Sequence, residues 1–292
     1  MTIRTDLPQA FNFAKPEGYQ AEPPADVMAN WAQKVLAAEG DSETEIAIYD
    51  IIGEDFWSGG GWTAARMKRA LAKATGRDVT VKINSPGGDV FEGLAIYNEL
   101  RGYKGKVNVQ VMGLAASAAS IVAMAADEIT MGLGTFLMIH KAWGYVVGNE
   151  DDFRAAGDLF AKFDGALSDI YVARTKKPAA EVAALMRAET WMAPQEAVAL
   201  GFADKVDETL KGEPAPNTTE NRALAARRQT EAALAKAGHS RTSRAALLGD
   251  LGAAPRDASR QTNEAPLDAS LDLTALAAFA AEMKGFATKL RS

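Results

Sequence analysis

Hydrophobic and polar positions alternate between strand-like and helix-like patterns from residue 45 to residue 207. The apolar run Ile46–Ile52 and the alternating segment Val79–Ile83 are typical of strands, and Thr63–Ala74 has the spacing of an amphipathic helix. The same criteria predict helices over Val90–Leu100, Ser117–Ala126, Asp151–Arg174, Pro178–Met186 and Pro194–Leu200, and strands over Val107–Met112, Glu128–Met131 and Phe136–Ile139. Strands that alternate with helices predict an α/β fold with a mostly parallel sheet whose faces are covered.

Weaker patterns on either side of this region divide the chain into four parts. Residues 1–43 are polar and contain proline, then become helical in pattern, so we interpret them as an N-terminal arm and leading helix. The compact domain is expected over 44–208. Residues 209–266 hold few large apolar residues, which predicts a low-complexity linker with at most transient helix. Residues 267–292 regain helical apolar spacing and predict an amphipathic tail helix.

Composition narrows the possible chemistry. The chain has 292 residues and no cysteine, which excludes disulfides, thiolate metal sites and cysteine nucleophiles. The net charge of −6 divides into −9 for residues 1–208 and +3 for residues 209–292. The main domain therefore has no broad basic face of the kind that binds nucleic acid. We expect no nucleic-acid partner, no metal and no cofactor.

One segment is long enough to raise the question of a membrane span. Val107–Ala126 carries no charged residue over 20 positions, but it includes Asn108, Gln110 and many alanines, which are only weakly hydrophobic in a bilayer. We interpret it as buried core. The first 14 residues lack the apolar core of a secretory signal. We therefore expect no membrane association and a cytoplasmic location.

Two turns between a predicted strand and a predicted helix could carry chemistry. In the segment 84–89 the paired glycines Gly87 and Gly88 allow a sharp turn whose N–H groups point at an anion or an oxyanion. In the segment 113–120 Ser117 opens a helix among small residues, so a substrate backbone could approach closely. Each turn taken alone also fits a simpler interpretation, an ordinary strand-to-helix turn and a helix cap respectively.

The histidines favour the chemical interpretation of Ser117. A serine hydroxyl usually needs a base with a pKa near neutrality, and the chain contains only His140 and His239. His239 lies in the predicted linker, whereas His140 follows an apolar strand. A Ser117–His140 pair is therefore the better hypothesis. Glu189, on a short link before a predicted helix, is one of 38 acidic residues that could orient the imidazole.

Taken in order, these segments resemble the proteolytic subunit of the Clp protease, the ClpP family, and especially its phage-type relatives that act as head-maturation, or prohead, proteases. The similarity covers approximately residues 45–207. It rests on Ile83-Asn84-Ser85-Pro86-Gly87-Gly88, the box from Gly113 to Ser120, Met138-Ile139-His140, and the run from Glu189 to Ala197 followed by Gly201-Phe202-Ala203-Asp204. The resemblance implies a ClpP/crotonase-like ββα spiral, assembled as homo-oligomeric rings, in which residues 151–174 form the long handle helix where two rings meet.

The resemblance also assigns roles to residues. It implies that Ser117 is the nucleophile, that His140 is the general base, and that the backbone N–H groups of Gly87 or Gly88 and of Ala118 form the oxyanion hole. Glu189 then takes the third catalytic position.

That third position departs from the family pattern. Housekeeping members of the family usually have Asp where this chain has Glu189, whose carboxylate lies one methylene further from the backbone. The loop that carries it must therefore sit slightly back if the carboxylate is to keep its contact with the histidine.

Several functions follow from this resemblance. We expect a serine endopeptidase that processes capsid or scaffold proteins during phage head maturation, in the bacterial or phage-infected cytoplasm or inside the procapsid. The alternatives are a general Clp-type subunit that works with an ATPase unfoldase, and a ring-forming assembly factor without activity. A crotonase-like acyl-CoA enzyme would not need the Ser–His pair and lacks a basic cluster for the CoA phosphates. A Ser–Lys peptidase of the same fold would leave His140 unexplained.

Overall fold

The computed structural model describes residues 7–10, 20–21, 25–32, 42–54, 61–212, 217–239, 243–244 and 246–248. By its internal contacts the chain divides into residues 1–252 and residues 253–292. The tail helix predicted over 267–292 lies outside the described residues.

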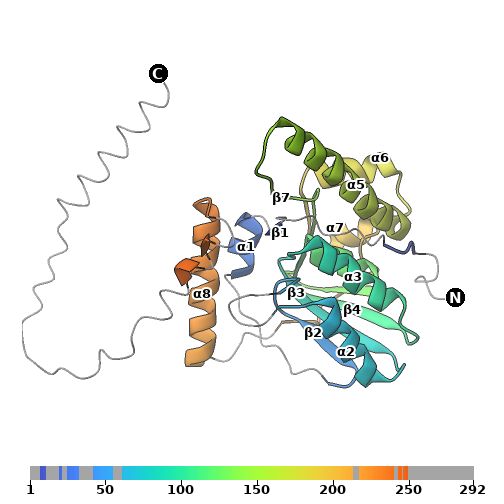
Figure 1. Cartoon of the computed structure of the whole chain (residues 1–292). Coiled ribbons are helices and arrows are strands. Elements are labelled where there is room, and N and C mark those ends of the chain that lie inside the picture. The colour runs from blue at the N-terminus through green and yellow to red at the C-terminus, as the bar shows by residue number, and fades with distance from the viewer. Residues whose placement is uncertain are drawn as a thin grey trace, which may run out of the picture. The chain divides into compact units, whose positions relative to one another are not determined.

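A seven-stranded sheet forms the centre of this unit (Figure 1). Its strands are β2 (Glu45–Ile48), β3 (Val79–Ser85), β4 (Val107–Ala116), β5 (Glu128–Gly132), β6 (Phe136–Ile139), β8 (Thr190–Met192) and β9 (Lys205–Asp207). The order β2-β3-β4-β5-β9 is parallel throughout, β6 pairs parallel with β4, and only β8 is antiparallel, on β6. The predicted α/β fold with a mostly parallel sheet is confirmed.

Strand β4 is longer than predicted, and its length positions the site. Its first half pairs with β5 from Asn108 to Val111, and its last three residues, Leu114 to Ala116, pair with β6. The strand therefore contributes to two parts of the sheet in succession. Its carboxyl end emerges beside the carboxyl end of β6. Because parallel strands end at the same edge of a sheet, residues that follow β4 and β6 lie close together.

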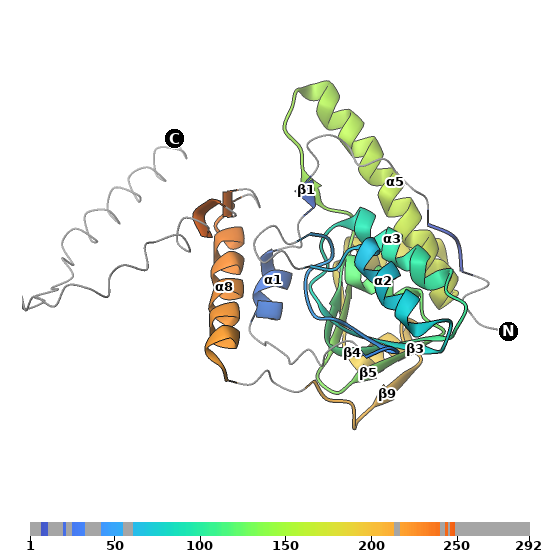
Figure 2. The ribbon, with the colours of Figure 1, turned by 60° about the horizontal axis from the view of Figure 1, so that its bottom comes forward.

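Helices lie over the sheet where the sequence pattern predicts them (Figures 1 and 2). They are α2 (Ala64–Ala74), α3 (Val90–Arg101), α4 (Ala118–Met124), α5 (Glu150–Thr175), α6 (Ala179–Arg187) and α7 (Pro194–Ala199). The ends follow local capping chemistry: the Thr63 hydroxyl accepts from the Arg66 N–H, and Asp89 accepts from the Phe91 N–H. Helix α4 begins one residue later than predicted, because Ser117 has a non-helical backbone.

Helix α5 has two different halves. Its second half packs on the core through Phe163, Leu167 and Tyr171, whereas its first half is mostly exposed and Phe153 keeps 55% of its surface accessible. Figure 2 shows this first half standing out from the rest of the unit. The exposed half is stabilised locally by an Asn149 capping box.

The N-terminal arm is bound to the domain at separate points. The Tyr97 hydroxyl donates to the carbonyl of Pro8 at 2.8 Å, and the Asn98 amide exchanges two hydrogen bonds with the backbone of Ala10. Strand β1 (Gln20–Ala21) pairs antiparallel with β7 (Gly144–Tyr145). The predicted leading helix is present as α1 (Ala25–Ala32).

The structure differs from the sequence interpretation in the segment expected to be a linker. Helix α8 (Thr219–Lys236) spans 18 residues there and packs beside α1 (Figure 1). The Arg228 guanidinium lies 3.6 Å from the ring centroid of Trp31 and donates to the carbonyl of Tyr49 at 3.0 Å. A search for large apolar residues misses this anchor, because an arginine here does the packing with its planar head and aliphatic stem.

Candidate active site

The nucleophile candidate occupies a strained turn between β4 and α4. Ser117 has φ 55° and ψ −125°, a region that non-glycine residues rarely adopt. Its N–H donates to the carbonyl of Met138 on β6 at 3.0 Å. The small neighbours Ala116 and Ala118 are buried, so the turn fits tightly against the sheet and leaves the serine half-exposed. This is the sharp strand-to-helix geometry that presents a nucleophile above a sheet.

The histidine candidate meets this serine directly. His140 follows the last residue of β6, is 7% exposed, and its Nε2 lies 2.7 Å from the Ser117 Oγ. If Nε2 accepts the serine proton, the neutral ring carries its own proton on Nδ1. The loop after the ring is held by Asp164 of α5, which accepts from the Ala142 N–H at 2.8 Å and pairs with Lys141 at 2.8 Å. The structure thus brings together the two residues that the sequence pairs.

The turn that contains Gly87 and Gly88 also lies against Ser117. A Cβ on Gly87 would come within 2.7 Å of the Ser117 Cβ, and a Cβ on Gly88 within 2.2 Å of the Ile52 carbonyl oxygen. Both glycines also have positive φ, 89° and 147°. Close approach and backbone conformation therefore both require glycine here.

The N–H groups of the two glycines differ. The Gly87 N–H donates to the Ser85 Oγ at 3.2 Å. The N–H groups of Gly88 and Ala118 have no acceptor among the described residues, and both residues line the pocket that contains Ser117. Of the two glycines that the sequence offers for the oxyanion hole, the geometry therefore favours Gly88.

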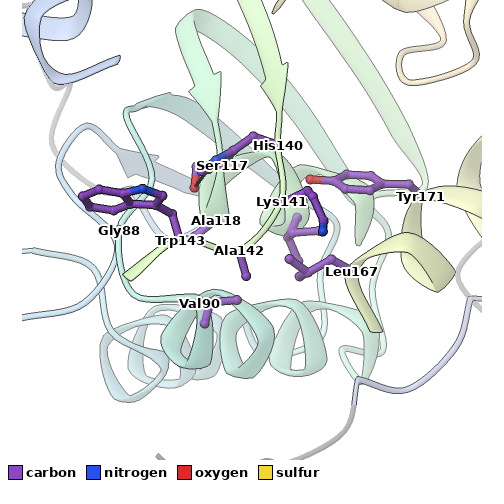
Figure 3. Close-up of a pocket in the computed structure, with 11 residues that line it drawn as sticks. Gly88, Val90, Ser117, Ala118, His140, Lys141, Ala142, Trp143, Leu167 and Tyr171 are labelled. Carbon is purple, nitrogen blue, oxygen red and sulfur yellow. Dashed lines mark hydrogen bonds between the residues drawn. The ribbon is translucent and has the colours of Figure 1, made fainter. Parts of the chain in front are cut away.

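The pocket beside this pair is small and mainly apolar. Its volume is about 20 Å³. Figure 3 shows the Ser117 and His140 side chains next to each other and the Tyr171 ring entering from α5. The remaining walls come from Val90, Ile121, Lys141, Ala142, Trp143 and Leu167, besides Gly88 and Ala118.

Glu189 lies near the pair by register but does not contact it. Strand β8 pairs Thr190 with Ile139, so one further step in this antiparallel register would set Glu189 opposite His140. Its φ of 50° interrupts the strand at this point. Its side chain is exposed, and its carboxylate makes no hydrogen bond or ion pair within the described part of the chain. The role of Glu189 stays a prediction.

Three residues near the site were not singled out by sequence reasoning: Ser120, Asp164 and Tyr171. Asp164 holds the histidine loop, and Tyr171 with Ser120 lies beneath the serine turn. Asp164 and Tyr171 are seven residues apart on α5, so they share one face of that helix. That spacing was visible in the sequence, but nothing in it indicated which face of the helix meets the site.

The described residues offer neither a metal site nor a membrane span. They contain no group of three or more His, Asp or Glu side chains arranged to hold a metal ion. None of their helices combines the length and the hydropathy that a membrane crossing requires.

The fold and the site together define an α/β protein with a serine–histidine pair at the carboxyl edge of a mostly parallel sheet. A family model described as Clp protease matches residues 63–209, half of the chain. The chain therefore belongs to the Clp protease family.

Several known proteins are similar to parts of this chain. The chain is 34% identical over 132 residues to an ATP-dependent Clp protease proteolytic subunit of Deinococcus radiodurans, a match that covers 44% of this chain and 65% of the relative. It is 33% identical over 135 residues to the ATP-dependent Clp protease proteolytic subunit 1 of Protochlamydia amoebophila, covering 45% of this chain and 66% of the relative. The matches thus span just under two thirds of these relatives. A solved structure of a ClpP1 mutant from Listeria monocytogenes is similar at 20% identity and a TM-score of 0.49, covering 57% of this chain and 92% of that one.

Proposed function

We propose that this chain is a serine endopeptidase of the ClpP type, with Ser117 as nucleophile and His140 as general base. The observation that carries the proposal is the 2.7 Å contact between the Ser117 Oγ and the His140 Nε2, beside two backbone N–H groups that have no acceptor in the described protein. A base must lie within hydrogen-bonding reach of the proton it takes, and this one does.

The reaction follows from that geometry. The Ser117 Oγ attacks the carbonyl carbon of a peptide bond while its proton passes to the His140 Nε2. The N–H groups of Gly88 and Ala118 donate to the oxygen that becomes negative in the tetrahedral intermediate. His140 then returns the proton to the departing amine, which leaves an acyl group on the serine. Water, deprotonated by the same imidazole, releases the acid and restores the enzyme.

For the third catalytic residue we propose Glu189. Support comes from its position directly before β8, where one further step of the β6–β8 register would bring it opposite His140. Its exposed carboxylate would have to turn toward the ring, a change that a substrate chain or a second copy of the protein could stabilise by covering this edge. A carboxylate there would stabilise the imidazolium that forms during attack.

We further propose that the substrates are capsid or scaffold proteins of an assembling phage head, met inside homo-oligomeric rings or a procapsid. Support comes from the resemblance in the sequence and from the long segment after residue 208, which exceeds what the sheet needs. The exposed first half of α5, with Phe153, offers a surface for ring contacts. The alternative is a general Clp-type subunit that works with an ATPase unfoldase; the two relatives are named as proteolytic subunits of an ATP-dependent Clp protease.

A serine-directed fluorophosphonate probe tests the catalytic proposal. The purified full-length protein should be labelled, Ser117→Ala should not be, and His140→Ala should react at least about 100-fold more slowly, in line with general-base contributions. The matched control is His239→Ala, which removes the other histidine and should react normally. Labelling that survives in Ser117→Ala, or normal reaction of His140→Ala, contradicts the proposal.

Two further measurements test the role of Glu189 and the proposed substrates. Glu189→Gln should slow peptide hydrolysis while Glu189→Asp retains part of it; full activity in Glu189→Gln removes Glu189 from the triad. If the substrates are phage capsid or scaffold proteins, the protein should cleave purified scaffold or capsid precursor without nucleotide. Cleavage of folded substrates that occurs only with an added ATPase unfoldase and ATP would favour the alternative.

A further inference from the structure

Beneath the serine turn, two buried hydroxyl groups form a hydrogen-bonded chain that the reaction described above does not use. The Ser120 Oγ donates to the backbone carbonyl of Ser117 at 2.6 Å. The hydroxyl of Tyr171, on α5, lies 2.7 Å from the same Ser120 Oγ. Ser120 is fully buried and Tyr171 is 1% exposed, so neither group exchanges this partner for bulk water.

The direction of the chain follows from the number of protons. A serine hydroxyl has one proton, and Ser120 gives it to the Ser117 carbonyl, so Tyr171 must donate to Ser120. Burial raises the pKa of the Tyr171 phenol far above its ordinary value, with the Ser120 hydrogen bond acting weakly in the opposite direction. The phenol therefore keeps its proton over the pH range in which a protease works. Tyr171 thus always donates to Ser120, and Ser120 to the Ser117 carbonyl.

The hydrogen-bonded chain ends at the Ser117 carbonyl, and the geometry of the peptide group links this carbonyl to the Ala118 N–H. The carbonyl of Ser117 and the N–H of Ala118 belong to one planar, trans peptide unit and point in opposite directions. The carbonyl oxygen accepts from the Ser120 hydroxyl and also from the backbone N–H groups of Ser120 at 2.9 Å and Ile121 at 3.4 Å. The hydroxyl adds the shortest of these bonds, and together they hold the oxygen toward α4 and so turn the Ala118 N–H the other way. That N–H lacks an acceptor in the described protein, and Ala118 lines the pocket with Ser117.

We propose that Ser120 and Tyr171 are positioning residues that orient the Ala118 N–H as an oxyanion donor by anchoring the Ser117 carbonyl. The inference rests on the proposed function and adds residues to the same site. Donation to the carbonyl also polarises the peptide group, which strengthens its N–H as a donor. The anchor further opposes relaxation of the Ser117 backbone from its unusual conformation, φ 55° and ψ −125°.

A purely local explanation accounts for the Ser120 hydrogen bond but not for the Tyr171 hydrogen bond. Serine hydroxyls often bond to a carbonyl three residues earlier, so the Ser120 contact alone would be unremarkable. The Tyr171 hydroxyl, however, comes from 51 residues further along the chain. A phenylalanine would fill the same apolar space, next to Phe202, without burying a hydroxyl that needs a partner.

The test compares Ser120→Ala, Tyr171→Phe and the double variant, using hydrolysis of a short peptide ester. Because the N–H acts on the developing oxyanion, kcat should fall about 10-fold in each single variant with KM nearly unchanged, a smaller loss than the roughly 100-fold or more that follows deletion of an oxyanion donor itself. The double variant should be no slower than the slower single variant, because both changes interrupt one chain. Tyr97→Phe is the matched control: Tyr97 is also fully buried and bonded through its hydroxyl, but to Pro8 on the arm, and its kcat should not change.

A second measurement uses inhibitors. A peptide aldehyde, which forms an oxyanion on reaction with the serine, should bind about 10-fold more weakly to Tyr171→Phe, whereas the corresponding peptide alcohol should bind equally to both proteins. Losses that multiply in the double variant, or equal losses for aldehyde and alcohol, overturn the inference.

Failure of this inference and failure of the proposed function give different results. If the unmodified protein reacts with the fluorophosphonate probe and both variants keep full kcat, only the positioning role is lost. If the unmodified protein does not react, the proposed function fails first, and crystal structures of Ser120→Ala and Tyr171→Phe still decide the positioning role. A peptide group between Ser117 and Ala118 that keeps its orientation in both structures would refute it.

Discussion

Two helices of this protein, α4 and α8, both contain several alanines but lie in opposite environments. All seven residues of α4 are buried, whereas α8, with 18 residues, buries only Arg228 and Ala232 among its described side chains. In α4 the alanines allow close packing: a Cβ on Gly93 of α3 would lie 3.0 Å from the Ala118 Cβ. In α8 most alanines mainly provide helix propensity, and the helix is held by Arg228 on Trp31 and by Ala232 in the apolar cluster that contains Trp31. The sequence pattern predicts a helix over α4 but a linker where α8 lies, so several alanines alone do not show whether or how a helix is held.

The largest expected difference between the two helices is their response to added volume. Ala123→Leu places three carbons into a fully buried position of α4 and should lower the free energy of unfolding by about 3 kcal/mol, since overpacking costs roughly 1–3 kcal/mol and at times more. Ala223→Leu adds the same atoms to an exposed position of α8 and should change stability by less than about 0.5 kcal/mol. Urea unfolding of both variants measures the contrast. Equal losses would mean that α8 is as tightly packed as α4.

Removal of α8 should have a smaller effect than a change inside α4. A chain that ends after residue 212 loses the Arg228–Trp31 stack and the Arg228 bond to Tyr49, which together are expected to contribute about 1–2 kcal/mol. It should still fold and should react with the fluorophosphonate probe at the normal rate, because no residue of α8 lines the pocket. Circular dichroism melting and probe kinetics check both points. A chain that ends after residue 252 retains α8 and is the control; an unfolded or unreactive shorter chain would show that α8 supports the site itself.

The same comparison shows where the sequence was informative. The strands β2 to β6 and the helices α2 to α7 were predicted to within a few residues, because each of them buries an apolar face that leaves a visible pattern, whereas the short strands β8 and β9 were not predicted. Ser117 and His140 could be paired because strand ends at one sheet edge meet and few histidines compete. The N–H groups of Gly87 and Gly88 could not be told apart, since only the structure shows that Ser85 accepts from one of them.

Contacts carried by polar side chains left no such pattern. The anchor of α8 is an arginine, and the chain beneath Ser117 consists of two hydroxyl groups 51 residues apart. The sequence does not state which of many arginines stacks on which ring, or which hydroxyl lies under which turn. Glu189 illustrates the same limit: one further step of the β8 register would set it opposite His140, but its backbone φ of 50° and its exposure are set by the loop and not by residue type.

The smallest effect in this comparison concerns a single side chain. If the guanidinium plane of Arg228 holds α8, Arg228→Lys should lose about 1 kcal/mol although it keeps the charge, because an ammonium cannot both stack flat on Trp31 and donate sideways to the Tyr49 carbonyl. Arg222→Lys, at an exposed position of the same helix, is the matched control and should cost almost nothing. Protease cleavage between residues 212 and 217 followed by release of α8 would report the loss directly, since a weaker anchor lets the cleaved helix dissociate faster. Equal release from the two variants would mean that α8 is held by its alanines after all, and that it differs from α4 in exposure alone.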